Sequence, residues 1–424
     1  MEKVAILGMG LSGRSCKDFF LRKKIPFICV DRDQKTLKEL SLQNISTILE
    51  TEIMPKNIST LIVGPAISRT HPWVLLAKQR KIPIKTEIDL ALEILSKNKK
   101  PCFGITGSNG KTTTALFLAH LLNICGVKSL AVGNIGVLFL DHVENSDIAA
   151  FSVELSSFQL EKANLYSVMT AGVILNFSAN HLDFHKNMKE YLLAKFNLRF
   201  YLDKKAPFFI PKEIFLEAVN VYSNSFKIED YINDSLIKQD LNIFPHDIYN
   251  FSIAFLLASS VYDISEHMFY KAIHSFRKPP HRLENIIEID GIKYVNDSKS
   301  TTVAAVRAAV LAIRKNVIII MGGIDKGGDF SSLLSVFENK VKLVICFGKA
   351  AKLLYYIFSI EYLVSKRETL EEALEEACKH AKKGDTVLFS PGCSSFDQFK
   401  NFEHRGEMFK KLVYRLKRER FCET

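Results

Sequence analysis

Short apolar runs alternate with segments of helical periodicity along the whole chain. Near the start, these runs cover Val4–Leu7, Phe27–Val30 and Thr60–Val63. Apolar runs of this length, each followed by a polar turn and an amphipathic stretch, predict buried strands joined by helices. We therefore predict an α/β fold with doubly wound sheets.

Two polar stretches that end in proline divide this pattern into three parts. Ser96–Pro101 and Arg277–Pro280 are expected to be linkers, so we predict domains at 1–97, 98–280 and 281–424. In the second and third parts, strands are predicted over Pro101–Ile105, Ile148–Val153, Ala171–Leu175, Ile292–Val295, Asn316–Met321, Val341–Cys346 and Thr386–Phe389. Helices are predicted over Thr113–Cys125, Met188–Phe200 and Phe251–Val261. The alternation in the third part predicts a parallel sheet.

Composition narrows the class of protein. An apolar content of 47% and a charged content of 24% over 424 residues are typical of a globular protein, and no apolar run approaches the roughly 20 residues of a membrane span. The start lacks a signal-peptide pattern, and the eight cysteines form no C-x-x-C pair, so we expect a cytoplasmic protein with reduced thiols.

The net charge of +11 has two interpretations. One is solubility together with a basic helical tail over Lys410–Arg420. The other is an electrostatic field that attracts anionic substrates such as nucleotides and carboxylates. No nucleic-acid-binding motif is present, so we do not expect a nucleic-acid partner.

The stretch Gly104–Thr113 carries the strongest chemical signal. It places a strand, a glycine-rich turn, a Lys-Thr pair and a helix in the order of a phosphate-binding loop. Lys111 would reach the β- and γ-phosphates, and the Thr112 hydroxyl would hold Mg²⁺. Ile105 stands where the strict pattern has glycine, so the motif alone leaves a nucleotide site and a plain strand–helix turn equally open.

A second glycine-rich turn, Gly8–Gly13, follows the first predicted strand, and Asp31 ends the second. This fingerprint is typical of an NAD site. The same geometry serves any pyrophosphate, including that of a UDP group.

Polar residues follow the other strands at the edge where open α/β sheets bind ligands. Glu154 ends a strand downstream of the phosphate loop and suits a Mg²⁺ partner, although the segment can also be read as the start of a helix. His181 follows the next strand, and Lys195 lies on a predicted helix; taken alone, each is more often structural or solvated. In the third part, Asp297–Thr301, Lys326 and Ser395–Phe396 are predicted to converge on one rim.

Several of these segments together resemble the Mur ligase family, in its D-glutamate-adding branch. The resemblance rests on Gly107–Thr113, Asn176–His185 with Tyr191–Lys195, Asn296–Thr301, Gly322–Gly328 and Ser390–Phe399. It implies a Rossmann-like N-terminal domain, a P-loop ATPase-like central domain and a Rossmann-like C-terminal domain. It also implies ATP-dependent addition of D-glutamate to UDP-N-acetylmuramoyl-L-alanine through an acyl phosphate, in peptidoglycan biosynthesis.

The resemblance also assigns roles to individual residues. Lys111, Glu154, His181 and Lys195 would be catalytic. Two Mg²⁺ ions would be held by Thr112, Glu154, His181 and, if carbamylated, Lys195. ATP would contact Gly107, Ser108, Asn109, Gly110, Lys111, Thr112, Thr113, Asn250, Arg282 and Asp297. The UDP substrate would contact Leu11, Ser12, Asp31, Arg32 and Asn134. D-glutamate would contact Lys299, Thr301, Lys326, Ser395 and Phe396. We expect a monomer.

The chain departs from the family pattern at three positions, since Asn180 replaces an acid, Asp247 an asparagine and Arg32 a threonine. Two rival interpretations stay open. A dinucleotide-binding protein would use only the first glycine-rich turn and would bind a nicotinamide cofactor. A ligase of the same chemistry with another amino acid would keep the phosphate loop and change the third-domain pocket.

Overall fold

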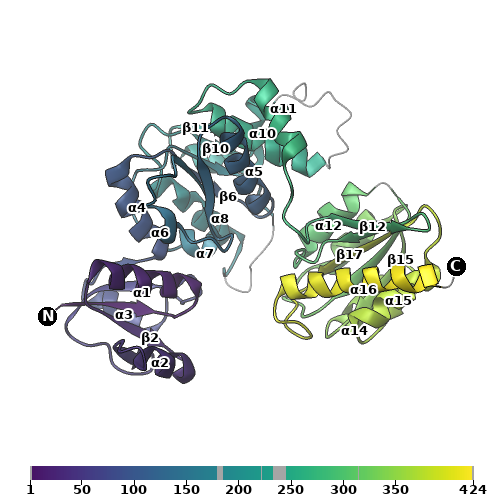
Figure 1. The fold of residues 1–424 in the computed structure, drawn as a ribbon, viewed down its shortest axis with the longest axis horizontal. Helices are drawn as coiled ribbons and strands as arrows, with labels where there is room; N and C mark the ends of the chain where they lie inside the picture. The colour runs from purple at the N-terminus through teal and green to yellow at the C-terminus, as the bar shows by residue number, and fades with distance from the viewer. Residues whose placement is uncertain (1, 179–184, 221, 233–244, 314, 423–424) are drawn as a thin grey trace. The chain divides into compact units, whose positions relative to one another are not determined.

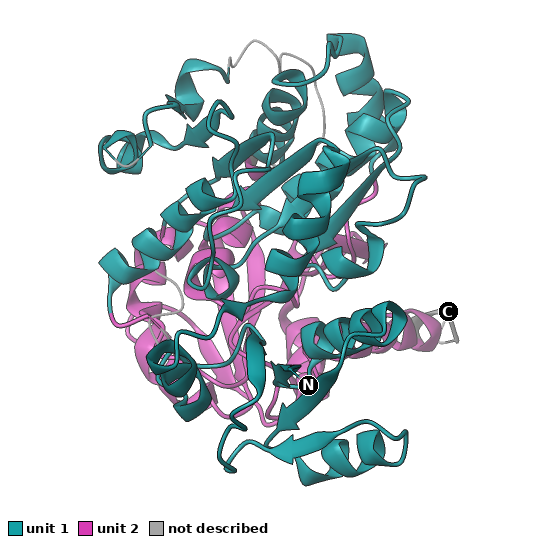
Figure 2. Ribbon diagram, turned by 90° about the vertical axis from the view of Figure 1, so that its left-hand side faces the viewer, with its two compact units in different colours: residues 1–177, 187–242, 247–276 teal, residues 178–186, 243–246, 277–424 magenta. Residues whose placement is uncertain are grey.

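The computed structural model describes residues 2–178, 185–220, 222–232, 245–313 and 315–422 of the 424. Its chain forms two compact units (Figure 2). The first comprises residues 1–177, 187–242 and 247–276, and the second comprises 178–186, 243–246 and 277–424.

The first unit begins with a five-stranded parallel sheet in the order β3-β2-β1-β4-β5. The third glycine of the Gly8–Gly13 turn is required by packing, because a Cβ at Gly13 would lie 2.0 Å from the Gly8 carbonyl oxygen. The elements are β1 Lys3–Leu7, α1 Leu11–Lys23, β2 Phe27–Asp31, α2 Gln34–Ser41, β3 Thr47–Leu49, β4 Ile58–Val63, α3 Pro72–Gln79, β5 Ile84–Lys85 and α4 Glu87–Asn98.

A six-stranded parallel sheet in the order β11-β10-β9-β6-β8-β7 follows in the same unit. Its strands are β6 Cys102–Thr106, β7 Ser129–Gly133, β8 Ala150–Glu154, β9 Ala171–Ile174, β10 Phe208–Ile210 and β11 Ser225–Lys227. Its α-helices are α5 Lys111–Ile124, α6 Phe139–His142, α7 Ser157–Leu160, α8 Met188–Phe196, α9 Phe215–Val219, α10 Pro245–Ser259 and α11 Glu266–Ser275; short 3₁₀ turns cover Asn197–Phe200, Lys212–Ile214 and Ile228–Asp230.

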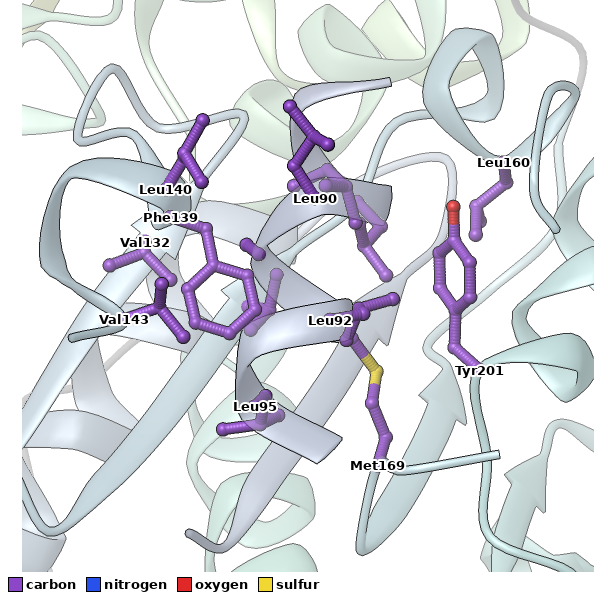
Figure 3. Close-up of a cluster of buried hydrophobic side chains, with 14 of the residues drawn as sticks. Leu90, Leu92, Leu95, Val132, Phe139, Leu140, Val143, Leu160, Met169 and Tyr201 are labelled. Atoms are coloured by element: carbon purple, nitrogen blue, oxygen red, sulfur yellow. The ribbon is translucent and has the colours of Figure 1, made fainter. Parts of the chain in front are cut away.

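Helix α4 corrects the first expected linker. It runs to Asn98 and therefore includes the first part of the polar stretch Ser96–Pro101. Its start is fixed by a capping box between Thr86 and Asp89. Its leucines pack with side chains of the central part, among them Val132 and Phe139 (Figure 3). Burial of this apolar face holds the two sheets of the first unit to a common core.

Glu87, the first residue of α4, is a buried carboxyl inside this core. Its Oε1 accepts a hydrogen bond from the Leu140 amide at 2.7 Å, and its Oε2 has no hydrogen-bond partner among the described residues. Burial, with a smaller contribution from nearby Asp141, raises the pKa of Glu87 to about 7, although the backbone hydrogen bonds act in the opposite direction. The ionised form is therefore disfavoured in the folded chain.

The pH dependence of stability follows from this shift. The pKa of Glu87 rises from 4.5 to about 7 on folding. The contribution of this carboxyl to the free energy of unfolding is therefore present at acid pH and is lost as pH rises through about 7. Glu87→Gln keeps the acceptor for Leu140 and cannot ionise. We expect it to stabilise the chain by about 3 kcal/mol at pH 8 and to change little near pH 4.5, measured by urea unfolding with Trp73 fluorescence. Glu144→Gln, at an exposed carboxylate, is the control, and equal effects of Glu87→Gln at both pH values would contradict the account.

The second unit contains a six-stranded mixed sheet in the order β12-β13-β17-β14-β15-β16. The four strands predicted here pair in parallel as expected, but β12, which was not predicted, runs antiparallel to β13 and makes the sheet mixed. Asp290 and Gly291, both with positive φ (51° and 76°), form the tight hairpin turn between them. The strands are β12 Glu284–Ile289, β13 Ile292–Asn296, β14 Val317–Gly322, β15 Val341–Phe347, β16 Val364–Lys366 and β17 Thr386–Gly392.

Helices cover both faces of this sheet (Figure 1). Ile319 faces the cluster that holds α12 and α14, whereas Ile318 and Ile320 face the cluster that holds α15 and α16. Because β14 is covered by apolar side chains on both faces of the sheet, its sequence is a continuous apolar run. The helical elements are α12 Val303–Ala312, the 3₁₀ turn Phe330–Leu333, α13 Leu334–Phe337, α14 Ala351–Phe358, α15 Leu370–His380 and α16 Phe402–Cys422. None of the helices in the described part of the chain has the length and apolar character that crossing a bilayer requires.

Candidate active site

The predicted phosphate loop joins β6 to α5. Gly110 caps the helix with φ +83°, and a Cβ there would lie 2.4 Å from the Asn250 side-chain oxygen. The loop thus brings Asn250, a predicted ATP contact, against its own backbone. Helix α5 begins at Lys111, two residues before the expected start, because the turn at Gly110 already directs the chain into the helix.

The Lys111 side chain folds back over the loop. Its Nζ donates to the carbonyl oxygens of Gly107 at 2.9 Å and Ser108 at 3.0 Å. This places an ammonium group beside the backbone amides at the start of α5, where a helix N-terminus favours an anion. The arrangement fits a phosphate group.

Thr112 and Glu154, two of the predicted Mg²⁺ ligands, lie in direct contact. The Thr112 hydroxyl donates to Glu154 Oε2 at 2.6 Å, and the Asn134 amide donates to Glu154 Oε1 at 3.0 Å. Glu154 is buried at the end of β8. A carboxylate and a hydroxyl are hard oxygen donors of the kind Mg²⁺ prefers, so these residues fit the ion. Asn134, predicted to contact the UDP substrate, here holds Glu154.

Lys195 lies on the other side of the same loop. Its Nζ donates to the Gly107 carbonyl at 2.8 Å and lies 4.3 Å from the centre of the Tyr191 ring. Only 1% of Lys195 is exposed. Burial, reinforced by the positive charge of Lys111, holds the pKa of Lys195 well below its usual range. The charged form of this amine is therefore disfavoured.

Asn176 and Tyr191 position the loop, and neither was predicted as a site residue. Asn176 accepts from the Asn109 amide at 2.9 Å and donates to the Asn109 carbonyl at 3.1 Å. The Tyr191 hydroxyl lies 3.2 Å from the Ser108 hydroxyl. The position of Asn176, directly after β9 on the ligand edge of the sheet, is the signal that would have found it.

His181 lies outside the described residues, so its predicted metal role stays a prediction. Among the described residues, no three His, Cys, Asp or Glu side chains gather as a metal-binding group. A Mg²⁺ ion bound beside a phosphate loop uses few protein ligands and takes the rest from phosphate and water. The Thr112–Glu154 pair is of that kind.

In the first domain, Asp31 supports the glycine-rich turn. Its carboxylate accepts from the Met9 amide at 2.6 Å and from the Asp33 amide at 2.9 Å. Of the other predicted substrate contacts there, Leu11 and Arg32 are exposed and Ser12 is half-buried. These side chains remain accessible beside the turn.

The second unit brings its three predicted polar clusters to adjacent strand ends. They follow β13, β14 and β17, and β17 pairs in parallel with the other two, so the prediction that they share one edge is confirmed. Lys299 and Thr301 are half-buried, Lys326 and Phe396 are exposed, and Ser395 is buried. Lys299 Nζ lies 3.7 Å from the centre of the ring of Phe402, a residue that the sequence did not suggest.

Asp297, a predicted ATP contact, is engaged within its own unit. It accepts hydrogen bonds from the Leu283 amide at 3.1 Å, the Ser390 hydroxyl at 2.9 Å and the Ser300 hydroxyl. Burial raises the pKa of Asp297 to about 6, against the opposing effect of these donors. Arg282, the other ATP contact predicted in this unit, lies between the linker and β12.

Arg405 was not predicted as a site residue, although it lies beneath this edge of the sheet. It is fully buried and donates to the carbonyl oxygens of Ser298 at 2.8 Å, Cys393 at 3.0 Å and Gly322 at 3.5 Å. Those carbonyls belong to the ends of the three strands that carry the polar clusters. One guanidinium therefore joins all three loops.

Comparison with known proteins agrees with this arrangement. Three family models match the chain: "Mur ligase MurD-like, N-terminal domain" over residues 2–86, "Mur ligase middle domain" over 105–254 and "Mur ligase, glutamate ligase domain" over 281–393. The chain belongs to the Mur ligase family. The prediction of three α/β domains of this family is confirmed.

Two relatives of the Mur ligase family are named UDP-N-acetylmuramoylalanine–D-glutamate ligase. The protein of Chlamydia pneumoniae is 40% identical over 416 residues, which cover 97% of this chain and 98% of the relative. The protein of Chlamydia trachomatis serovar D is 37% identical over 423 residues, with the same coverage. Among solved structures, the MurF ligase from Thermotoga maritima in complex with ADP matches with a TM-score of 0.62 at 16% identity, covering 92% of this chain and 95% of that one. This last likeness concerns the fold.

Proposed function

We propose that this Mur ligase joins D-glutamate to UDP-N-acetylmuramoyl-L-alanine at the expense of ATP, in peptidoglycan biosynthesis. The observation that carries the proposal is 37–40% identity, over nearly the whole chain, to ligases named for that reaction. The contact between Thr112 and Glu154 beside the phosphate loop supports the use of a nucleotide. The alternative of a dinucleotide-binding protein does not account for the family matches over residues 105–254 and 281–393.

The chemistry starts with two anions. A carboxylate oxygen of the UDP substrate attacks the γ-phosphorus of ATP, the bond to the β-phosphate oxygen breaks, and ADP leaves. The D-glutamate amine then attacks the acyl carbon, loses a proton, and inorganic phosphate departs. Because a bare carboxylate is a poor electrophile, phosphorylation supplies the leaving group.

In this proposal the chain's main task is to offset negative charge. Lys111 brings its ammonium to the phosphates, and the loop amides from Gly107 to Thr113 add further donors. Thr112 and Glu154 would hold Mg²⁺, which neutralises phosphate charge when bound. Asn134 keeps the Glu154 carboxylate in place. His181 is proposed as a further metal ligand.

The substrate contacts and the domain limits are also proposals. The UDP substrate would lie at Leu11, Ser12, Asp31, Arg32 and Asn134, and ATP would also contact Asn250, Arg282 and Asp297. D-glutamate would lie at Lys299, Thr301, Lys326, Ser395 and Phe396, where ammonium and hydroxyl donors suit its carboxylates. The limits 1–97, 98–280 and 281–424, a monomeric state and a cytoplasmic location remain predictions.

Carbamylation of Lys195 would follow from its burial beside the Gly107 carbonyl and from a pKa below its usual range, which favours the amine without its extra proton. A neutral amine adds CO₂ and releases a proton, which turns the side chain into an anion suited to a Mg²⁺ ion. We expect removal of CO₂ to lower ligation at least about tenfold and bicarbonate to restore it. The measurement is phosphate release in degassed and bicarbonate-supplemented buffer, with incorporation of ¹³C-labelled CO₂ followed by NMR.

Lys195→Ala should show neither the labelled signal nor the bicarbonate effect. Lys128→Ala, at an exposed lysine of the same unit, should retain both. Full activity of the wild-type protein without CO₂, together with an absent carbamate signal, would contradict this assignment.

The reaction itself is tested by phosphate release from ATP with the UDP substrate present. Reactions containing D-glutamate, L-glutamate or no amino acid are compared, with Mg²⁺ and bicarbonate supplied. Release that requires D-glutamate is the expected result. Release with another amino acid would reassign the third-domain pocket, and no release under any pairing would overturn the proposal.

A further inference from the structure

The loop Gly64–Arg69 forms one border of the first sheet's ligand edge. It follows β4, which pairs in parallel with β1, so it lies beside the Gly8–Gly13 turn. The Gly64 amide donates to the Leu7 carbonyl at 3.0 Å, and the Ile67 side chain packs against Gly8, where an added Cβ would lie 3.4 Å from Ile67 Cδ1. A shift of this loop would therefore disturb the turn.

The same loop is bound to the central domain by two cations. Lys162 Nζ donates to the carbonyl oxygens of Pro65 at 2.5 Å and Gly64 at 3.2 Å. Arg69 donates from Nη2 to the Glu161 carbonyl at 2.7 Å, and its Nε lies 2.9 Å from Glu161 Oε1. The contacts run in both directions, since a central-domain lysine binds the loop and a loop arginine binds the central domain.

The central-domain side of these contacts is connected to the phosphate site through a short stretch of chain. Glu161 and Lys162 follow α7, which begins three residues after Glu154. A capping box between Ser156 and Gln159 fixes this helix, and Ser156 and Gln159 are both buried. Loop 64–69 is thus held at a set position relative to the carboxylate that contacts Thr112.

The contact of Lys162 with the loop differs from an ordinary ion pair, because the ammonium binds backbone carbonyl oxygens. Lys162 is half-buried, its hydrogen bonds go to two carbonyl oxygens, and burial lowers its pKa to about 8. Two fixed carbonyls define the position of an ammonium more narrowly than a single mobile carboxylate. The geometry suits positioning of the loop.

We infer that Lys162 and Arg69 form a clamp that sets the position of the first domain's ligand edge relative to the phosphate loop and Glu154. The inference rests on the proposed function. There, one end of the UDP substrate is bound by the first domain while its carboxylate must reach the γ-phosphate at the central domain. Lys162 and Arg69 are positioning residues, because their contacts are to protein groups rather than to reacting atoms.

The test compares steady-state kinetics of Lys162→Met and Lys162→Arg with the wild-type enzyme. Methionine keeps the apolar stem and removes the donors, so we expect kcat/KM for the UDP substrate to fall about tenfold or more, because misplacement of reacting groups is costly. The KM for ATP should change less than about twofold, and Lys162→Arg should recover most of the loss, since a guanidinium also donates to carbonyl oxygens.

Lys23→Met is the matched control. Lys23 also bridges the first and central domains, through Glu144 at 2.6 Å, but both side chains are exposed and the pair does not involve loop 64–69. We expect this variant to behave as wild type. Arg69→Met should act like Lys162→Met, and the double variant should be less impaired than the product of the two single effects, because both hold one loop.

Two results would overturn the clamp. One is a Lys162→Met enzyme whose kcat/KM for the UDP substrate equals that of Lys23→Met. The other is an equal loss in kcat/KM for the UDP substrate and for ATP that arginine does not repair, which would indicate general damage. Failure of the proposed function is distinct, because the wild-type protein would then release no phosphate with D-glutamate.

Discussion

Lys111→Ala is expected to abolish ligation while leaving the fold intact. The ammonium it removes lies over the phosphate loop, bound to the Gly107 and Ser108 carbonyls, and is the basic group nearest the start of α5 in the proposed mechanism. Removal of one fixed positive charge next to the transferred phosphoryl group lowers the reaction rate about 10³-fold. Phosphate release with both substrates present measures the loss.

Stability should change little in the same variant. The Lys111 side chain is only partly buried, and the loop carbonyls it leaves can bind water, so the free energy of unfolding should fall by less than about 1 kcal/mol. Circular dichroism melting checks this. Lys128→Ala, at an exposed lysine paired with Asp147, should keep full activity. An active Lys111→Ala enzyme would overturn the assignment of the phosphate loop.

The second large effect is expected on stability, from Arg405→Leu. Arg405 is fully buried, and burial lowers its pKa to about 10. The substitution leaves the carbonyl groups of Ser298, Cys393 and Gly322 without their charged donor inside the sheet's edge. We expect the loss of the donor to these buried acceptors to lower the free energy of unfolding by about 4 kcal/mol.

Urea unfolding separates this effect by unit. Trp73 is the single tryptophan of the chain and lies in α3, so its fluorescence reports the first unit, whereas far-UV circular dichroism reports both. We expect part of the dichroism transition to move to lower urea while the Trp73 transition stays in place. Arg415→Leu, at a half-exposed arginine of the same helix paired with Glu371, should cost less than about 1 kcal/mol. If the Arg405→Leu variant unfolded at the same urea concentrations as the wild-type protein, the role of the buried guanidinium would be contradicted.

The sequence by itself determined the main strands of each sheet and their order along the chain, whereas short strands such as β10 Phe208–Ile210 and β16 Val364–Lys366 were not predicted. Apolar runs such as Ile148–Val153 predicted strands because strands buried on both faces must be continuously apolar. Glycines marked the turns, and the predicted polar residues do follow the carboxyl ends of the strands. These are local signals, written within a few residues of the feature that they predict.

The tertiary structure decided which of these residues act together. Three contacts join residues that are far apart in the sequence. The separation is 42 residues between Thr112 and Glu154, 88 between Gly107 and Lys195, and 107 between Ser298 and Arg405. The pKa of Lys195 is lowered because the side chain is buried and lies near the charge of Lys111, and a sequence window shows neither. The direction of β12 likewise depended on two left-handed residues at its turn, whereas the surrounding alternation suggested parallel strands. Burial and partners distant in sequence set these properties, because both arise only when the chain is packed.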